Sequence, residues 1–105
     1  RNNEIIQVKA DRMPIGIHER AGQSFQNHVL DAIKGDVLYT YSDGFQDQFG
    51  GPKNKKFMAK KLKDLFLEIH QRPMEEQKEV LIDTFRDWTV SSQQIDDVIV
   101  IGVRI

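Results

Sequence analysis

Acidic residues at the ends of two apolar segments are the first candidates for chemistry in this sequence. The Asp43-Gly44 pair follows the segment Val37 to Ser42, which is rich in apolar and aromatic residues. The Asp96-Asp97 pair precedes the apolar segment Val98 to Ile105. Carboxylate oxygens are the ligands that Mg²⁺ and Mn²⁺ favour, and aspartates from two strands could hold two cations that clamp a phosphoryl group. Spacing alone favours an Asp-Gly hairpin turn and a polar strand boundary at the Asp pair, with a metal site for phosphoryl chemistry as the alternative.

The other reactive side chains form less specific patterns. Ser42 lies in no Gly-x-Ser-x-Gly elbow, and the chain has no phosphate-binding or dinucleotide-binding glycine loop. The histidines lack the spacing of metal ligands and are expected to be surface or hydrogen-bonded residues: His18, His28 and His70. A local basic patch fits either a solvated helix face or a site for phosphate or an acidic partner: Lys53, Lys55, Lys56, Lys60, Lys61 and Lys63.

Hydrophobic periodicity predicts the strands that would position the aspartates. A short strand is expected from Ile5 to Ala10. Phe25 to Ile33 alternates as a half-buried strand does, and Val37 to Tyr41 is rich in β-branched and aromatic residues. Because Lys34-Gly35-Asp36 supplies a turn between them, we predict a β-hairpin from about Gln26 to Ser42.

The second half of the chain changes to a helical period. Gly50 to Lys56 is predicted to be an exposed loop, and Phe57 to Ile69 an amphipathic helix. Pro73 is placed to begin a second helix. The buried residues expected on that helix are Met74, Leu81, Ile82, Phe85 and Trp88. Val98 to Ile105 is almost wholly apolar, as in a central strand covered on both faces. We therefore predict the α+β class, with a mostly antiparallel sheet and two consecutive amphipathic helices.

Composition limits the class of protein. The chain has 105 residues, of which 39% are hydrophobic and 30% charged, as in one globular domain. A net charge of -1 argues against generic nucleic-acid binding, and the absence of cysteine excludes disulfides and thiolate zinc sites. No apolar run is long enough to span a membrane, so we expect no membrane contact by this segment. We also expect a cytoplasmic location for it, in a longer protein that could carry membrane or sensor segments upstream. The opening residue Arg1, without an initiator Met, predicts a segment of a longer protein.

Three segments together resemble a known family. They are Met13 to Gly16, Lys34 to Gly44 and Asp96 to Ile101, in that order. In them the chain resembles the C-terminal half of a metal-dependent serine/threonine phosphatase of type 2C. The similarity is to the bacterial branch of stage II sporulation protein E and the sigma-factor-regulating phosphatases. The resemblance implies a β-sandwich with helices outside both sheets, of which residues 1–105 would be a single-domain fragment.

The same resemblance implies roles for the acidic residues. Asp43 would be a metal-ligating aspartate with Gly44 as its companion, and Asp96 would be the last aspartate, which closes on the second metal. Asp97 would lie in the next shell, and Asp47 is a further neighbour of the site. The family uses Mn²⁺ or Mg²⁺, and a metal-bound water attacks phosphoserine or phosphothreonine directly. The loop that carries Lys53, Lys55 and Lys56 follows Asp43 closely enough to flank the entrance and contact the substrate.

One departure from the family pattern affects the expected activity. The first metal motif, an Asp followed shortly by Gly-His-Gly, is absent, so we expect the fragment by itself to be inactive. The substrate of the longer protein would be a phosphorylated protein such as an antagonist of an anti-sigma factor. The fragment is expected to form homo-oligomers through Val37 to Tyr41, Val98 to Ile105 or Ile5 to Val8. The alternative is a non-catalytic regulatory or protein-binding module.

Overall fold

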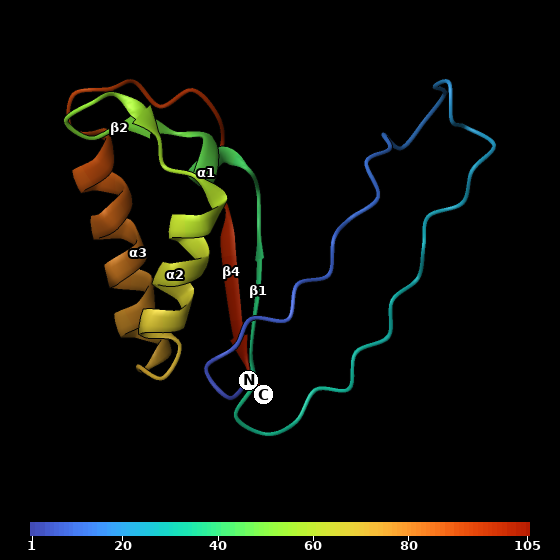
Figure 1. Cartoon of the computed structure of the whole chain (residues 1–105), viewed down its shortest axis with the longest axis horizontal. Helices are drawn as coiled ribbons and strands as arrows, with labels where there is room; N and C mark the ends of the chain where they lie inside the picture. Colours follow the sequence, from blue (N-terminus) through green and yellow to red (C-terminus); the bar gives the residue numbers. More distant parts are fainter.

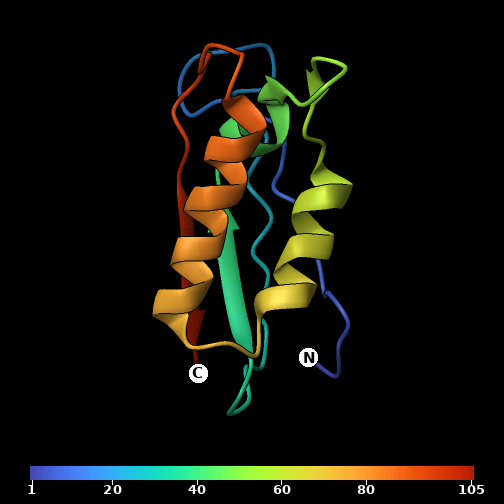
Figure 2. The same cartoon turned by 90° about the vertical axis from the view of Figure 1, so that its left-hand side faces the viewer.

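Two consecutive helices cover one face of a two-stranded antiparallel sheet in the computed structural model, which describes all residues 1–105 (Figures 1 and 2). The order of elements is β1 (Val37–Tyr41), α1 (Gly44–Asp47), β2 (Phe49–Gly50), β3 (Lys55–Lys56), α2 (Ala59–Ile69), α3 (Met74–Thr89) and β4 (Val100–Arg104). β1 pairs with β4, and β2 pairs with β3 in a second small sheet. The predicted α+β class with antiparallel sheets and two consecutive helices is confirmed.

The register of β1 and β4 separates their side chains into two faces. Val37 lies opposite Arg104 and Tyr41 lies opposite Val100. Because side chains alternate along a strand, one set points to the helices and the other points away from them. The second set we call the open sheet face, and its residues are Leu38, Thr40, Ile99, Ile101 and Val103, all of them exposed.

Aromatic residues fill the space between the sheet and the helices. The ring of Tyr39 in β1 stacks on Phe66 in α2 with centroids 4.1 Å apart. Phe45 in α1 makes edge contacts with Phe57 and with Phe85 of α3, each at 5.1 Å. Aromatic pairs in these geometries add to the free energy of burying their apolar area. The core therefore joins α1, α2, α3 and β1 into one packed unit.

The two helices form where the apolar spacing predicts them. The short connection between α2 and α3 is closed by Gln77, which is buried. Its Nε2 donates to the backbone oxygens of His70 and Arg72, and its Oε1 accepts from the Tyr39 hydroxyl at 2.5 Å. Burial raises the pKa of that Tyr39 hydroxyl. The expectation that Ile82 is buried is wrong, since its side chain faces solvent on α3.

The first 36 residues form no strand, which contradicts two predictions. The segment from Ile5 to Ala10 is irregular and exposed, and so is Phe25 to Ile33. Figure 1 shows this part of the chain, coloured blue to teal, extending away from the sheet and helices as a long open loop. The predicted hairpin from Gln26 to Ser42 is wrong because β1 pairs with β4 instead. An alternating pattern specifies a face to bury, but a strand also needs a neighbour for its backbone hydrogen bonds.

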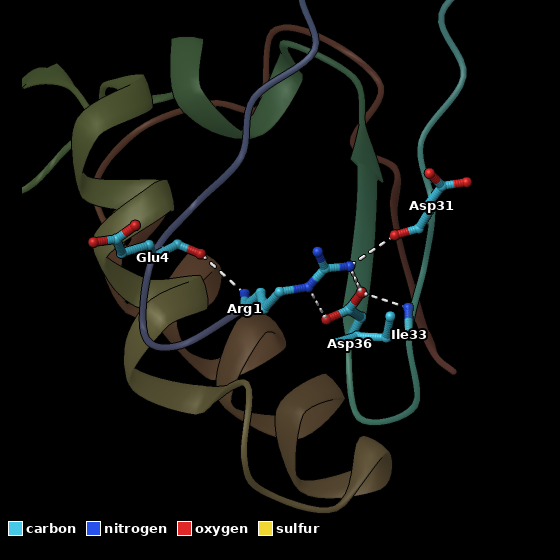
Figure 3. A network of polar contacts seen from close by, with 5 residues as sticks. All are labelled: Arg1, Glu4, Asp31, Ile33 and Asp36. Carbon is cyan, nitrogen blue, oxygen red and sulfur yellow. Dashed lines mark hydrogen bonds and ion pairs between the residues drawn. The ribbon is translucent and has the colours of Figure 1, made fainter.

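A polar network fastens the start of the chain to the turn that precedes β1 (Figure 3). The guanidinium of Arg1 donates to both carboxylate oxygens of Asp36, at 3.1 and 2.6 Å, and to the backbone oxygen of Asp31. The backbone N–H of Ile33 also donates to Asp36. The hydrogen bonds from Arg1 and then from Ile33 lower the pKa of Asp36 to about 2. The predicted turn at residues 34–36 is present, with Gly35 at a φ of 96°.

Two further predictions are corrected by the sheets. β4 is not central, because β1 is its one neighbour and its open face is uncovered. The segment Gly50 to Lys56 is not wholly a loop, because its ends belong to the β2–β3 ladder, in which Gly50 lies opposite Lys55. None of the helices combines the length and the apolar character that crossing a bilayer requires.

Candidate metal site

Strand pairing brings the two acidic segments to one edge of the β1–β4 sheet. Asp43 follows the end of β1, and the Asp96-Asp97 pair precedes the start of β4. The end of one strand and the start of its antiparallel neighbour lie at the same edge. The backbone N–H of Ser42 donates to the backbone oxygen of Ile99 at 3.0 Å, so pairing continues past the strand ends toward the aspartates. The structure thus brings the predicted segments together, although they are more than 50 positions apart in the sequence.

Gly44 presses directly against the backbone of Asp97. A Cβ atom placed on this buried glycine would lie 2.1 Å from the backbone oxygen of Asp97 and 3.3 Å from a methyl carbon of Val98. Real Cβ atoms do not approach other atoms closer than 3.0 Å. The absence of a side chain at Gly44 is therefore needed for this contact between the two acidic segments.

The side chains of the predicted ligands are exposed and sparsely paired. Asp43 is the N-cap residue directly before α1, where its backbone oxygen accepts the N–H of Asp47 at 2.9 Å, and its carboxylate makes no hydrogen bond or ion pair within the chain. One carboxylate oxygen of Asp96 accepts the backbone N–H of Asp97 at 2.8 Å. Free carboxylate oxygens are the donor set that a hard divalent cation takes.

Asp47, expected to be a neighbour of the site, forms an ion pair with a lysine of the small sheet. Its carboxylate lies 3.6 Å from the ammonium nitrogen of Lys56 in β3. That ion pair is partly exposed and contributes little to stability. Asp47 itself lies one helical turn after Asp43, since its N–H donates to the Asp43 backbone oxygen.

The chain contains fewer acidic ligands at this edge than a closed cation site has. No group of three or more histidine, aspartate or glutamate side chains is placed to hold a metal ion. Magnesium keeps a nearly octahedral shell and is held by carboxylates together with water or substrate oxygens. Asp43 and Asp96 offer the oxygen donors that a hard cation prefers, and these two carboxylates alone would be only part of such a ligand set.

A buried glutamine, which the sequence did not single out, supports both acidic segments. Gln48 follows α1 and is fully buried. Its Nε2 donates to the backbone oxygen of Gln93, in the segment that leads to Asp96, at 2.9 Å. Its own backbone oxygen accepts the Phe57 N–H at 2.9 Å and the indole N–H of Trp88 at 2.8 Å. A single buried polar residue such as Gln48 belongs to no periodic pattern of apolar residues, so the sequence alone could not have identified it.

The basic side chains divide into paired and unpaired groups. Lys61 lies 4.4 Å from the ring centroid of Trp88, a cation–π contact, and Lys60 pairs with Asp64 at 3.0 Å. Lys53 and Lys55 are exposed and form no ion pair. Lys55 lies in β3 and Lys53 in the turn between β2 and β3. This hairpin is anchored on α3, because Gly51 N–H donates to the backbone oxygen of Trp88 and a Cβ on Gly50 would overlap that same oxygen.

The small sheet, α1 and the segment before β4 all lie at one end of the molecule, at the top of Figure 1. The exposed lysines of the β2–β3 hairpin are therefore at the same end as Asp43 and Asp96. The histidines are not part of this arrangement, and the one on the helical unit, His70, contacts Asn3 at 3.0 Å. At this end of the molecule the carboxylates of Asp43 and Asp96 and the ammonium groups of Lys53 and Lys55 thus form no ion pair within the chain.

Comparison with known proteins decides the family. The sequence profile of the stage II sporulation protein E family, SpoIIE, matches residues 1–105. The chain belongs to the SpoIIE family. A solved structure, the SiaA-PP2C domain of Pseudomonas aeruginosa, is similar to the chain with a TM-score of 0.74 and 26% sequence identity. The match covers 81% of this chain and 35% of the SiaA-PP2C chain, so this chain spans about a third of that structure. No curated protein sequence matches this chain.

The predicted resemblance to the C-terminal part of a type 2C phosphatase is confirmed by these matches. Membership of the SpoIIE family supports a phosphatase domain, and the type 2C phosphatases are generally metal-dependent. The fold predicted from that resemblance is also confirmed as a partial type 2C fold. The roles of Asp43, Gly44, Asp96, Asp97 and Asp47 remain predictions.

Proposed function

We propose that this chain is the C-terminal portion of a bacterial phosphoserine or phosphothreonine protein phosphatase that depends on Mn²⁺ or Mg²⁺ and acts in signalling. The observation that carries the proposal is the contact of the Asp43-Gly44 turn with the Asp96-Asp97 segment. The backbones of the two segments are packed there too closely to admit a side chain at Gly44, and each segment carries an exposed carboxylate at the same sheet edge. A hairpin turn or a polar strand boundary would not require that packing.

Asp43 and Asp96 would hold the cation, and Asp97 would support them from the adjoining backbone. When bound, the cation would lower the pKa of a water and stabilise charge on the phosphoryl oxygens. The chain supplies only part of the ligand set, so we propose that the isolated chain binds metal weakly and does not hydrolyse phosphoesters. The substrate would be a phosphorylated cytoplasmic protein of the class of anti-sigma-factor antagonists.

Substitution of Asp43 in a longer protein that contains the whole phosphatase domain tests the metal role. Asp43→Asn keeps the shape of the side chain and removes the charge, so the rate should fall by about a hundredfold or more. Excess Mn²⁺ should restore part of that rate. Asp87→Asn, on the exposed face of α3, is the matched control and should leave the rate unchanged. An Asp43→Asn enzyme with the wild-type rate and metal dependence would favour the turn interpretation.

We infer that Lys53, Lys55 and Lys56 bind the acidic surface of the protein substrate. Lys53 and Lys55 carry unpaired positive charges at the end of the molecule that holds the aspartates, on a hairpin anchored to Trp88. Replacing all three with alanine should raise KM for a phosphoprotein while KM for a small aryl phosphate changes little. Lys78→Ala on α3 serves as the control. Equal effects on the KM of both substrates would mean that these lysines are ordinary solvated surface residues and do not bind the protein substrate.

The open sheet face supports the proposal that the isolated chain self-associates. Ile101 and Val103 in β4, and Ile99 directly before it, are each about half exposed and occupy alternate positions on one face. The outer backbone edges of β1 and β4 are also unpaired. Apolar faces next to unpaired strand edges favour pairing between copies.

A further inference from the structure

The last backbone pair of the β1–β4 sheet is completed by a side chain. Continuing the register places Ser42 opposite Ile99. In a regular antiparallel pair of this kind, each residue would donate its N–H to the backbone oxygen of the other. Ser42 N–H does donate to Ile99 O, at 3.0 Å. The return bond is different, because Ile99 N–H donates to the hydroxyl oxygen of Ser42 at 3.1 Å.

The same hydroxyl also acts as a donor. Ser42 Oγ donates its proton to the backbone oxygen of Asp97 at 3.0 Å. A serine hydroxyl has one proton to give and can accept in addition, so this one group binds both Ile99 and Asp97. The oxygen of Asp97 is also the atom against which Gly44 lies. Ser42 thus holds in place the peptide group on which the Asp43-Gly44 turn packs.

The Ile99 N–H bonds to the side-chain oxygen of Ser42 and not to its backbone oxygen, and this allows the chain to leave the sheet after Ser42. Because the hydroxyl takes the N–H of Ile99, the backbone oxygen of Ser42 is not needed in the ladder. The next residue, Asp43, adopts helical dihedral angles, with φ of -72° and ψ of -7°, and α1 follows at once. A side chain without a hydroxyl would leave Ile99 N–H and Asp97 O without this partner.

We propose that Ser42 is a positioning residue whose hydroxyl sets the distance between the Asp43-Gly44 turn and the Asp96-Asp97 segment. It touches no reacting atom itself. Its influence on metal affinity rests on the proposed function, in which these two segments share a cation. The geometric part, that the hydroxyl holds the two segments together, does not depend on any metal.

Three serine and threonine variants of the 105-residue chain test the geometric part by NMR. Ser42→Ala should speed hydrogen exchange at the Ile99 amide and weaken the cross-relaxation between Gly44 Hα and the Val98 methyl groups. Ser42→Thr, which keeps the hydroxyl, should restore both. Ser92→Ala removes a hydroxyl from the same connection between α3 and β4, one that bonds only to Asn54, and should change neither.

Titration with Mn²⁺ alone tests the metal part on the same samples. In the wild-type chain the amides of Gly44 and Asp97 should broaden together, since both lie beside the proposed site. Ser42→Ala should need about tenfold more Mn²⁺ for the same broadening, in line with the loss of two hydrogen bonds. Ser42→Thr should match the wild type.

The outcomes separate the two parts. Wild-type exchange and cross-relaxation in Ser42→Ala would overturn the positioning role, as would a folded Ser42→Thr that behaves like Ser42→Ala. Absence of Mn²⁺ broadening in the wild type would overturn the proposed metal site, while the exchange data would still decide the role of the hydroxyl. If Ser42→Ala does not fold, Ser42→Cys keeps the shape with a weaker hydrogen-bonding group and should give intermediate exchange; a wild-type value would overturn the proposal.

Discussion

Replacing Gly44 with alanine would test how closely the Asp43-Gly44 turn lies against Asp97. Gly44 is the first residue of α1 and has no unusual backbone conformation that would exclude a side chain. By helix propensity alone, alanine would stabilise the protein by up to about 1 kcal/mol. The packing predicts the opposite sign, since the new Cβ would lie 2.1 Å from the backbone oxygen of Asp97.

The size of the effect follows from that distance. The nearest approach that real Cβ atoms tolerate is 3.0 Å, so the turn and the Asp97 peptide must separate by about 1 Å. The neighbour is backbone, which is held by Ser42 and cannot rotate away as a side chain would. Overpacking of this kind costs about 1–3 kcal/mol. A shift of about 1 Å in positioning groups can lower a catalytic rate by roughly a hundredfold.

Thermal unfolding of the chain and the rate of the longer protein measure the two effects. Gly44→Ala should lower Tm and should lower kcat far more than the loss of folded protein explains. Gly22→Ala is the control, because a Cβ there meets no atom within 4 Å. A Gly44→Ala protein with an unchanged or raised Tm and normal kcat would refute the close packing of the two segments.

Three other predictions follow from the core, the polar network and the open sheet face. Leu62→Ala should lower the free energy of unfolding in urea by about 2–5 kcal/mol, because the side chain is fully buried; a loss below 1 kcal/mol would contradict the described core. Asp36 has a lowered pKa of about 2, so its contribution to stability is present above its ordinary value of 3.8 and lost as the pH falls toward 2. Asp36→Asn should remove that acid-dependent part of a Tm profile, and an unchanged profile would count against the contact with Arg1. Light scattering should find the chain as a dimer or larger near neutral pH, and Ile101→Lys should shift it to monomer; a wild-type monomer at high concentration would reject self-association.

Local features of the sequence determined the helices and the identity of the candidate ligands. Helical hydrogen bonds join residues four apart, so the spacing of apolar residues before and after Pro73 was sufficient to predict α2 and α3. The aspartates were recognised in a similar way, from their position after one apolar segment and before another. The prediction that Ile82 is buried is wrong because the apolar face of α3 is wider than the part that the sheet and α2 cover.

Only the tertiary structure decided the strand partners and the contacts at the candidate site. The alternation in Phe25 to Ile33 predicted a strand beside β1, yet β1 pairs with β4 at the far end of the chain. A ladder bond depends on which distant segment arrives beside the strand, and no local pattern encodes that. The contacts of Gly44 with Asp97, and of Gln48 with Gln93 and Trp88, are long-range in the same sense. These contacts form because the segment after β1 lies against the segment that joins α3 to β4. Where the two segments meet depends on how all the helices and strands pack together.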